Sequence, residues 1–281
     1  MRLLRLVLAA LALAAVVLAA RVQADPPAAP QTTELGRGTT IVFVHSLGAG
    51  RMDWMPTARK LIGRYRVVLV DLPGHGTSPL PDPFSLEAAA ELLDAVIARQ
   101  KAESTVVVGQ GVGGMIALKA VAAHPDHSRG LLLLDTAVKS PLPVGEQEIA
   151  QITRFMDDNY ATFLQMAFSR MGRDSTESAK LFAMMSAAPP ATVKAYLRSL
   201  FTADANRDLK SLKTPPALVF TERMWKPGTS WGTLAKGAGY EDSTFAAPRR
   251  LAGAGMLVMK DQPDTLAAIV SEFANARVAA K

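Results

Sequence analysis

The stretch TVVVGQGVGG, residues Thr105–Gly114, joins a run of β-branched residues to a turn rich in glycine. Three consecutive valines in a short apolar run are typical of a strand that is buried on both faces. The segment Val112–Ala123 follows directly and has the apolar spacing of a helix. We therefore predict a buried strand that ends at a tight turn, with a helix beginning immediately after it.

The same alternation of apolar runs and helical patterns extends along the chain in both directions. Helical spacing recurs at Leu86–Arg99 and at Thr265–Arg277. Strands that alternate with helices predict an α/β fold, with a mostly parallel sheet and helices on both faces. The six runs predicted as strands are Thr40–His45, Tyr65–Asp71, Thr105–Gly109, Gly130–Asp135, Ala217–Thr221 and Arg250–Ala254.

One long segment, Thr136–Thr214, interrupts this alternation. It contains helix-like stretches at Glu146–Met171, Glu177–Ser186 and Ala191–Thr202 and no clear strand. We predict that residues of about 137–213 form a helical lid over the strand ends. Its many methionine and phenylalanine side chains suit either simple packing on the core or the lining of an apolar pocket, and both interpretations stay open.

The first residues have the pattern of an export signal. Two arginines within Met1–Arg5 precede fifteen uncharged apolar residues, Leu6–Ala20, and small residues stand three places and one place before Asp25. This predicts a secretory signal over residues 1–24, a flexible segment over 25–37 and a folded domain over 38–281. A retained membrane anchor is the alternative, although the apolar run is short for a span.

Composition narrows the class of protein further. The 281 residues are 49% hydrophobic and 20% charged, which is typical of a globular protein and excludes a disordered or fibrous one. The absence of cysteine excludes disulfides, thiolate metal sites and a cysteine nucleophile. Without residues 1–24 the chain holds 28 basic and 25 acidic residues with no long basic run. We therefore expect an exported protein, periplasmic or secreted, with no nucleic-acid partner, no stable membrane span after cleavage and no cofactor.

Four segments at the ends of predicted strands carry a resemblance to a known family. They are His45–Gly48 (HSLG), Asp71–Ser78 (DLPGHGTS), Gly109–Gly114 (GQGVGG) and Gly253–Pro263 (GAGMLVMKDQP). In this order and spacing the chain resembles the α/β-hydrolase superfamily, in its lid-bearing branch of esterases, lipases and C–C hydrolases. The resemblance covers about residues 38–278 and implies the α/β-hydrolase fold.

The resemblance also implies a catalytic triad, and this chain departs from it at each position. Gly111 stands where the family has its nucleophile on a G-x-S-x-G turn, and Met256 stands where the family has its histidine. Trp225 occupies the place of the acid, although Glu222 and Asp135 are carboxylates near strand ends. No histidine follows His127, so no shifted alignment supplies a base. Loss of nucleophile and base together predicts that ester hydrolysis is lost.

The loop at Ser46 and Leu47 corresponds to the family's oxyanion loop, where the backbone N–H groups of Leu47 and Val112 would face a carbonyl oxygen. We predict a non-hydrolytic binder of a small apolar or carbonyl-bearing ligand, or of a protein partner. Met256 and Trp225 would make the pocket more apolar. The predicted ligand contacts are Ser46, Leu47, Gly111, Val112, Trp225 and Met256.

Other interpretations stay open beside this one. The chain could be a divergent hydrolase or lyase that uses the inherited oxyanion site with a non-standard acid or base such as Glu222 or Asp135, or a purely structural or interaction protein. The letters of Gly109–Gly114 also fit a dinucleotide fingerprint. A Ser46–His75 pair is the remaining catalytic arrangement.

One further pattern, His124-Pro125-Asp126-His127, has the H-x-x-H spacing of a metal pair. The proline prevents the two histidines from sharing one helix face, and the pattern favours a surface turn. A zinc site needs three or four converging ligands, and the sequence indicates only these two. The sequence therefore predicts no metal site.

Overall fold

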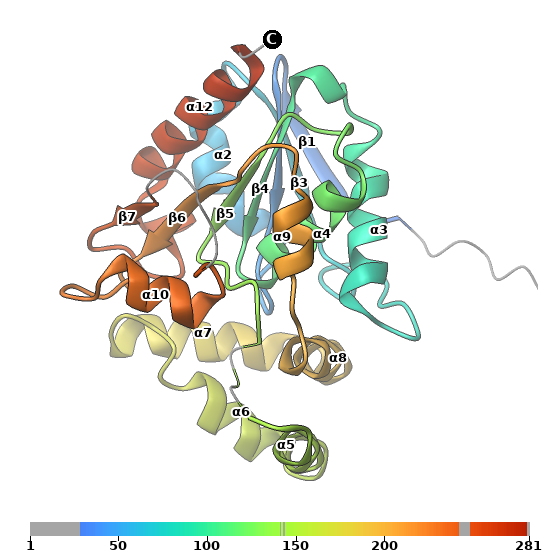
Figure 1. The fold of residues 1–281 in the computed structure, drawn as a ribbon, viewed down its shortest axis with the longest axis vertical. Coiled ribbons are helices and arrows are strands. Elements are labelled where there is room, and N and C mark those ends of the chain that lie inside the picture. The colour runs from blue at the N-terminus through green and yellow to red at the C-terminus, as the bar shows by residue number, and fades with distance from the viewer. Residues whose placement is uncertain (1–28, 141, 143, 242–247, 280–281) are drawn as a thin grey trace, which may run out of the picture.

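The computed structural model describes residues 29–140, 142, 144–241 and 248–279, which form one α/β domain (Figure 1). Within these residues seven strands form one sheet in the order β1-β3-β2-β4-β5-β6-β7. β1 runs antiparallel to β3 and all other pairs are parallel, so the predicted mostly parallel sheet is confirmed. The strands are β1 Thr32–Gly36, β2 Thr40–Val44, β3 Arg66–Val70, β4 Thr105–Gln110, β5 Leu131–Leu134, β6 Ala217–Thr221 and β7 Arg249–Leu251.

Helices cover both faces of the sheet, as its alternating buried side chains require. Val42 and Val44 of β2 pack toward one group of helices, whereas Ile41 and Phe43 pack toward the other. The first group is α3 Leu86–Ile97, α4 Val112–Ala123, α9 Asn206–Ser211 and α10 Trp231–Ala238. The second is η1 Arg51–Trp54, α2 Met55–Leu61, α11 Val258–Asp261 and α12 Pro263–Ala279, and the short η2 Ala102–Ser104 leads into β4.

The segment between β5 and β6 is helical, as the sequence predicts. Helices α5 Glu146–Asp158, α6 Tyr160–Phe168, α7 Ser175–Ala187 and α8 Pro190–Phe201 lie together beyond one end of the sheet (Figure 1). We call these four helices the helical insertion. The predicted single stretch Glu146–Met171 is divided at Asn159, whose φ of −133° and ψ of 47° end α5 and begin α6. The action of the insertion as a lid stays a prediction.

The structure differs from the sequence prediction at the two edges of the sheet. The segment 25–37, predicted to be flexible, contains β1, which pairs with β3 from Thr32 opposite Val70 to Gly36 opposite Arg66. No side chain of this edge strand is buried, so its sequence has no apolar signal. At the other edge β7 is shorter than the predicted Arg250–Ala254.

The predicted export signal lies outside the described residues. Within the described residues, no helix combines the length and the apolar character needed to cross a membrane.

The turn between β4 and α4 depends on a close approach of backbones. A Cβ added at Gly113 would overlap the carbonyl oxygen of His45 at the end of β2 and lie 2.9 Å from its carbonyl carbon. A Cβ at Gly109 would lie 2.6 Å from the Cα of Gly114. Because these neighbours are backbone atoms, they cannot yield by a change of rotamer. Glycine at these positions lets α4 begin directly above the sheet.

We expect Gly113→Ala to lower the free energy of unfolding by about 1–3 kcal/mol, because the new methyl group must push α4 away from β2. This loss should exceed the gain that alanine brings to a helix. The matched control is Gly63→Ala, since an added Cβ at Gly63 meets no heavy atom within 4 Å. Urea unfolding of both variants tests this expectation, and equal stabilities would contradict it.

Candidate functional site

The turn after β4 retains the backbone geometry of a nucleophile elbow without the nucleophile. Gly111 has a φ of 54° and a ψ of −125°, a conformation that side-chain-bearing residues rarely adopt. Its N–H donates a 3.0 Å hydrogen bond to the carbonyl oxygen of Leu134, which fixes the turn against β5. The position implied for a reacting side chain is therefore built, although glycine occupies it.

The side chain of Ser46 fills the space that a residue at position 111 would need. Ser46 lies in the loop after β2, and a Cβ added at Gly111 would overlap its hydroxyl oxygen and lie 3.1 Å from its Cβ. Ser46 is buried and lines a cavity. The hydroxyl group at this site thus comes from the neighbouring loop, and Gly111 and Ser46 are sterically complementary.

Met256, at the implied histidine position, lies beside the same turn. The side-chain amide of Gln110, the last residue of β4, donates a 2.7 Å hydrogen bond to the carbonyl oxygen of Met256. Met256 also lines the cavity, in the loop between β7 and α11. The structure therefore brings together Gly111, Ser46 and Met256, whose places correspond to the reacting centre of the resembled family, and provides no imidazole among them.

Both histidines near this site are held by structural contacts. Nδ1 of His45 lies 2.8 Å from the carbonyl oxygen of Ser46, and Nε2 accepts a 3.0 Å hydrogen bond from the N–H of Leu72. Nδ1 of His75 lies 3.1 Å from the carbonyl oxygen of Pro73, and Nε2 accepts from the N–H of Gly48 at 3.2 Å. Because both nitrogens of each ring are engaged with backbone, neither histidine is placed to take a proton from Ser46.

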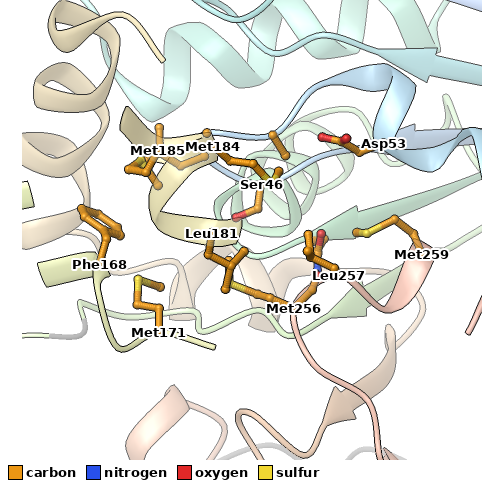
Figure 2. A pocket seen from close by; sticks show the side chains of 14 residues that line it. Ser46, Asp53, Phe168, Met171, Leu181, Met184, Met185, Met256, Leu257 and Met259 are labelled. Carbon is orange, nitrogen blue, oxygen red and sulfur yellow. The ribbon is translucent and has the colours of Figure 1, made fainter. Parts of the chain in front are cut away.

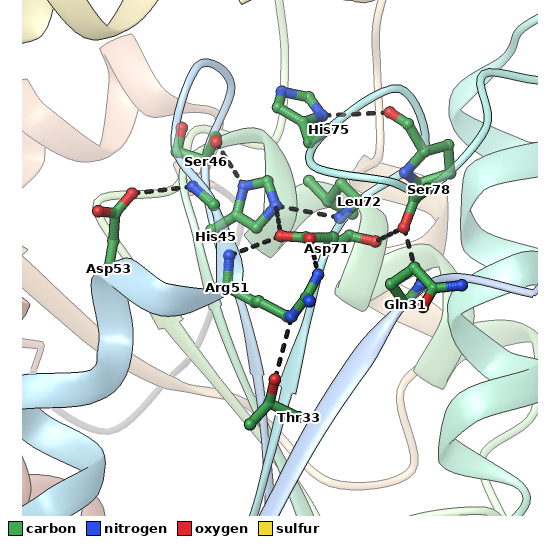
Figure 3. A network of polar contacts seen from close by, with 12 residues as sticks. Gln31, Thr33, His45, Ser46, Arg51, Asp53, Asp71, Leu72, His75 and Ser78 are labelled. Atoms are coloured by element: carbon green, nitrogen blue, oxygen red, sulfur yellow. Dashed lines mark hydrogen bonds and ion pairs between the residues drawn. The ribbon is translucent and has the colours of Figure 1, made fainter.

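The carboxylate of Asp71 organises the same loops from below (Figure 3). The carboxylate accepts a 2.7 Å hydrogen bond from the backbone N–H of Arg51 and forms an ion pair with the Arg51 guanidinium group. The backbone carbonyl oxygen of Asp71 accepts a 3.0 Å hydrogen bond from the hydroxyl of Ser78. The guanidinium group of Arg51 also bonds to Thr33 of β1, so the network joins the loops after β2 and β3 to the edge strand.

The two fallback carboxylates do not line the cavity. The carboxylate of Asp135 accepts hydrogen bonds from the N–H and the hydroxyl of Thr221 at 2.7 and 2.6 Å. Burial raises the pKa of Asp135 to about 6. Glu222 is paired with Arg250 at 2.7 Å. Each carboxylate thus has a structural partner in the described part of the chain.

Trp225, at the implied acid position, also lies outside the cavity wall. Its indole N–H donates a 2.8 Å hydrogen bond to the carbonyl oxygen of Thr229, and its ring packs 5.7 Å from that of Trp231. Gly111 and Val112 are likewise absent from the lining, whereas Ser46, Leu47 and Met256 belong to it.

The cavity lies between the loops at the strand ends and helix α7 of the insertion (Figure 2). Its volume is about 30 Å³, so a ligand larger than a water molecule enters only when lining side chains move, and the lining is mostly apolar. Its width depends on flexible side chains, because five methionines form much of the wall. They are Met171, Met184, Met185, Met256 and Met259.

A buried carboxylate that the sequence did not single out joins the insertion to the Met256 loop. Glu177 of α7 accepts hydrogen bonds from the N–H of Arg173 at 2.6 Å and of Leu257 at 3.2 Å. Arg223 adds a 2.9 Å hydrogen bond to the carbonyl oxygen of Met171. A glutamate in a helical pattern is ordinarily interpreted as solvent-exposed, so only the tertiary structure reveals this contact.

The buried histidines predict a loss of stability in acid. Burial lowers the pKa of His45 from 6.5 to about 4 and that of His75 to about 3. Below pH 6.5 the unfolded chain therefore binds protons that the folded chain does not, so stability falls as the pH falls. Asp135 acts in the opposite direction, because its pKa is raised in the folded state and protonation between about pH 6 and 4 favours folding.

We expect a net loss of about 1.4 kcal/mol of unfolding free energy per pH unit between about pH 6 and 4, since Asp135 offsets one of the two histidines. Asp135→Asn should roughly double this slope by removing the offset, while its amide keeps contacts with Thr221. Urea unfolding across this pH range measures both slopes. Equal slopes in the two proteins would contradict the assignment to Asp135.

Comparison with known proteins identifies the family to which this fold belongs. Residues 41–269 match the alpha/beta hydrolase family. A pimeloyl-[acyl-carrier protein] methyl ester esterase of Chromobacterium violaceum is 30% identical over 200 residues, which cover 67% of this chain and 77% of that protein.

Solved structures of similar fold include a thermophilic esterase of Thermogutta terrifontis, with a TM-score of 0.70, 21% identity and coverage of 88% of this chain and 93% of that one. A serine-to-glycine mutant of an N-acyl homoserine lactonase, complexed with N-hexanoyl homoserine lactone, matches with a TM-score of 0.61, 19% identity and coverage of 88% and 93%. The family match spans most of the described sheet and both sides of the elbow. The chain belongs to the α/β-hydrolase family.

Proposed function

We propose that this protein binds a small apolar, carbonyl-bearing ligand at the Ser46–Met256 cavity and does not hydrolyse it. The proposal rests on the arrangement at the turn after β4. Gly111 has no side chain there, and the Ser46 hydroxyl lies in the space that a side chain at this position would occupy. Acyl transfer by this fold needs a nucleophile with a general base within hydrogen-bond reach. The cavity wall contains no histidine, and His45 and His75 are engaged with backbone.

The site retains groups that suit a carbonyl oxygen. The N–H of Val112 opens α4, where the first N–H groups of a helix have no partner within it. Among the hydrogen bonds of the described residues, neither this N–H nor that of Leu47 donates to a protein acceptor. Leu47 belongs to the cavity wall and Val112 follows Gly111 on the turn, so their N–H groups would suit a carbonyl oxygen with no nucleophile to attack it.

The methionine-rich wall suits the remainder of such a ligand. Thioether side chains adapt to apolar chains of different shape, and Met184 and Met185 come from the insertion rather than from the sheet. The relatives also act on or hold acyl compounds, namely an acyl methyl ester esterase and a serine-to-glycine lactonase mutant with its acyl lactone. They support an acyl ester or acyl lactone as the ligand class.

Fatty acyl methyl esters of increasing chain length are the probes for binding, measured by calorimetry on the purified protein. We expect saturable binding at one site, and its loss in Leu181→Trp, where the larger side chain enters the cavity. Met166→Trp is the control, because Met166 belongs to the same insertion but is 72% exposed. Met184→Ala should favour longer chains, which keeps the test valid if Leu181→Trp unfolds.

Hydrolysis should be fastest when a serine and a histidine are restored and Ser46 no longer occupies the space beside position 111. We expect Ser46→Gly/Gly111→Ser/Met256→His to cleave p-nitrophenyl esters, although about ten-thousand-fold below a complete triad, because no carboxylate orients the new histidine. Gly111→Ser/Met256→His alone should be about tenfold or more slower than the triple variant, because Ser46 displaces the new serine.

The alternative function, a divergent hydrolase or lyase, makes the opposite prediction for the natural protein. Its reacting group would be Ser46, whose hydroxyl lies at the elbow. Turnover by the natural protein that disappears in Ser46→Ala would overturn the proposal and favour this alternative. Absence of ester hydrolysis by the natural protein, together with hydrolysis by the triple variant, supports the proposed binding function.

A protein partner is a second candidate, favoured by apolar side chains on the outer side of the insertion. Phe155 of α5 is 36% exposed, and both it and Met166 of α6 line one shallow groove. Phe155→Ser/Met166→Ser should abolish any such association, measured by sedimentation of the protein with its captured partner, and leave ligand binding unchanged.

The site of action in this proposal is outside the cytoplasm, as residues 1–24 predict. The intact mass of the protein recovered from the periplasm or medium tests it, and a mass that still includes these residues would contradict cleavage.

A further inference from the structure

We infer a binding site for a divalent transition-metal ion, of which Zn²⁺ fits best, formed by Asp94, His124 and His127, with a fourth position open to a water molecule. Asp94 belongs to α3, and the two histidines belong to the turn that follows α4. The three residues lie apart from the cavity and have no role in the proposed function. The site rests on the positions of their ligand atoms.

The histidine rings are arranged side by side by the turn that joins them. The N–H of His127 donates a 3.1 Å hydrogen bond to the carbonyl oxygen of His124, which closes the turn. The two rings are stacked, with an interplanar angle of 4° and 5.1 Å between centroids. Asp126, inside the turn, points elsewhere and pairs with Lys213 at 2.7 Å. The turn therefore directs both imidazoles toward α3 and directs the Asp126 carboxylate toward Lys213 instead.

The ligand atoms have the separations of a metal site. Nδ1 of His127 lies 2.9 and 3.1 Å from the two carboxylate oxygens of Asp94. Nε2 of His124 lies 3.7 Å from Asp94 Oδ2 and 3.4 Å from Glu91 Oε2. One ligand atom from each of Asp94, His124 and His127 can be chosen so that all lie within 4.8 Å of one another.

These separations suit tetrahedral zinc. Ligands at about 2.0–2.1 Å from a tetrahedral zinc ion lie about 3.3–3.4 Å apart, and the observed values fall on both sides of this edge length. Two imidazole nitrogens with carboxylate oxygens are a ligand set typical of Zn²⁺, whereas Mg²⁺ and Ca²⁺ prefer oxygen ligands alone. The ligand types therefore select a transition metal over the hard cations.

The burial of Asp94 is compatible with a cation here, although the His127 imidazole already lies within hydrogen-bond distance of its carboxylate. Its side chain is only 10% exposed, whereas the histidine side chains are 36% and 39% exposed. A buried carboxylate requires a positive partner or hydrogen-bond donors, and the described contacts of this carboxylate are with the two imidazoles. An ion between them would satisfy it and stay reachable from solvent through the histidines.

The position of the site indicates what the ion would do. It lies after the C-terminal end of α4, whereas Gly111 precedes the N-terminal end of this 12-residue helix. At 1.5 Å per residue the two sites are about 18 Å apart, so the ion takes no part in events at the cavity. It would fasten α3 to the end of α4 and stabilise the folded chain.

The test uses ZnCl₂ and untagged protein treated with a chelator and then desalted. Calorimetry should show one zinc ion per chain, and the melting temperature should rise with zinc and return after chelation. Co²⁺ in place of zinc should show the visible absorption bands of a tetrahedral site, and MgCl₂ should show no binding.

His124→Gln/His127→Gln should lower the zinc affinity by about tenfold or more, and Asp94→Asn should do the same. Asp126→Asn is the matched control, because this carboxylate lies in the same turn and faces Lys213. Circular dichroism confirms the fold of each variant. No saturable zinc binding by the natural protein, or equal binding by the double histidine variant and Asp126→Asn, would overturn the inference.

Discussion

The close approach of helix α4 to strands β2 and β4 is the constraint on which the site depends. The backbone of Gly113 lies against the carbonyl group of His45, and the backbone of Gly109 lies against Gly114. This contact forces the chain to turn within one residue, which gives Gly111 its positive φ. The position above the sheet is thus determined by packing that involves no catalytic group, and it persists although the side chain that the family's chemistry requires is absent.

In the loops around the elbow, too, the residues that hold the structure are different from those at the implied catalytic positions. His45, His75 and Asp71 are buried and bonded to backbone, and they hold the loops after β2 and β3 in place. Gly111 and Met256 hold no such contacts through their side chains, because one has none and the other lines the cavity. The residues that keep the family's pattern are those on which the loop geometry depends. Gly111 and Met256 stand where the resemblance implies the nucleophile and the base.

The fold could be predicted from the sequence because its signal is local, whereas several features of the site could not. Buried valine runs and the glycine turn predict the sheet and α4, and β1 was missed because none of its side chains is buried. The contact of Ser46 with position 111 joins residues 65 places apart, so no spacing rule indicates it. Asp94 escaped notice for the same reason, since α3 supplies it to a turn 30 residues later.

The position of the Ser46 side chain beside Gly111 affects how readily substitutions at this site could produce ester hydrolysis. In a site that had merely lost its nucleophile, a serine at position 111 would find open space. Here the neighbouring loop has filled that space with a side chain of its own, so the serine and the loop residue are sterically coupled. A side chain at position 111 requires the Ser46 hydroxyl to change its rotamer, and Met256 adds a second barrier that is chemical rather than steric. Under the proposed binding function, the apolar wall and the backbone N–H group of Leu47 are the parts of the site that act on the ligand.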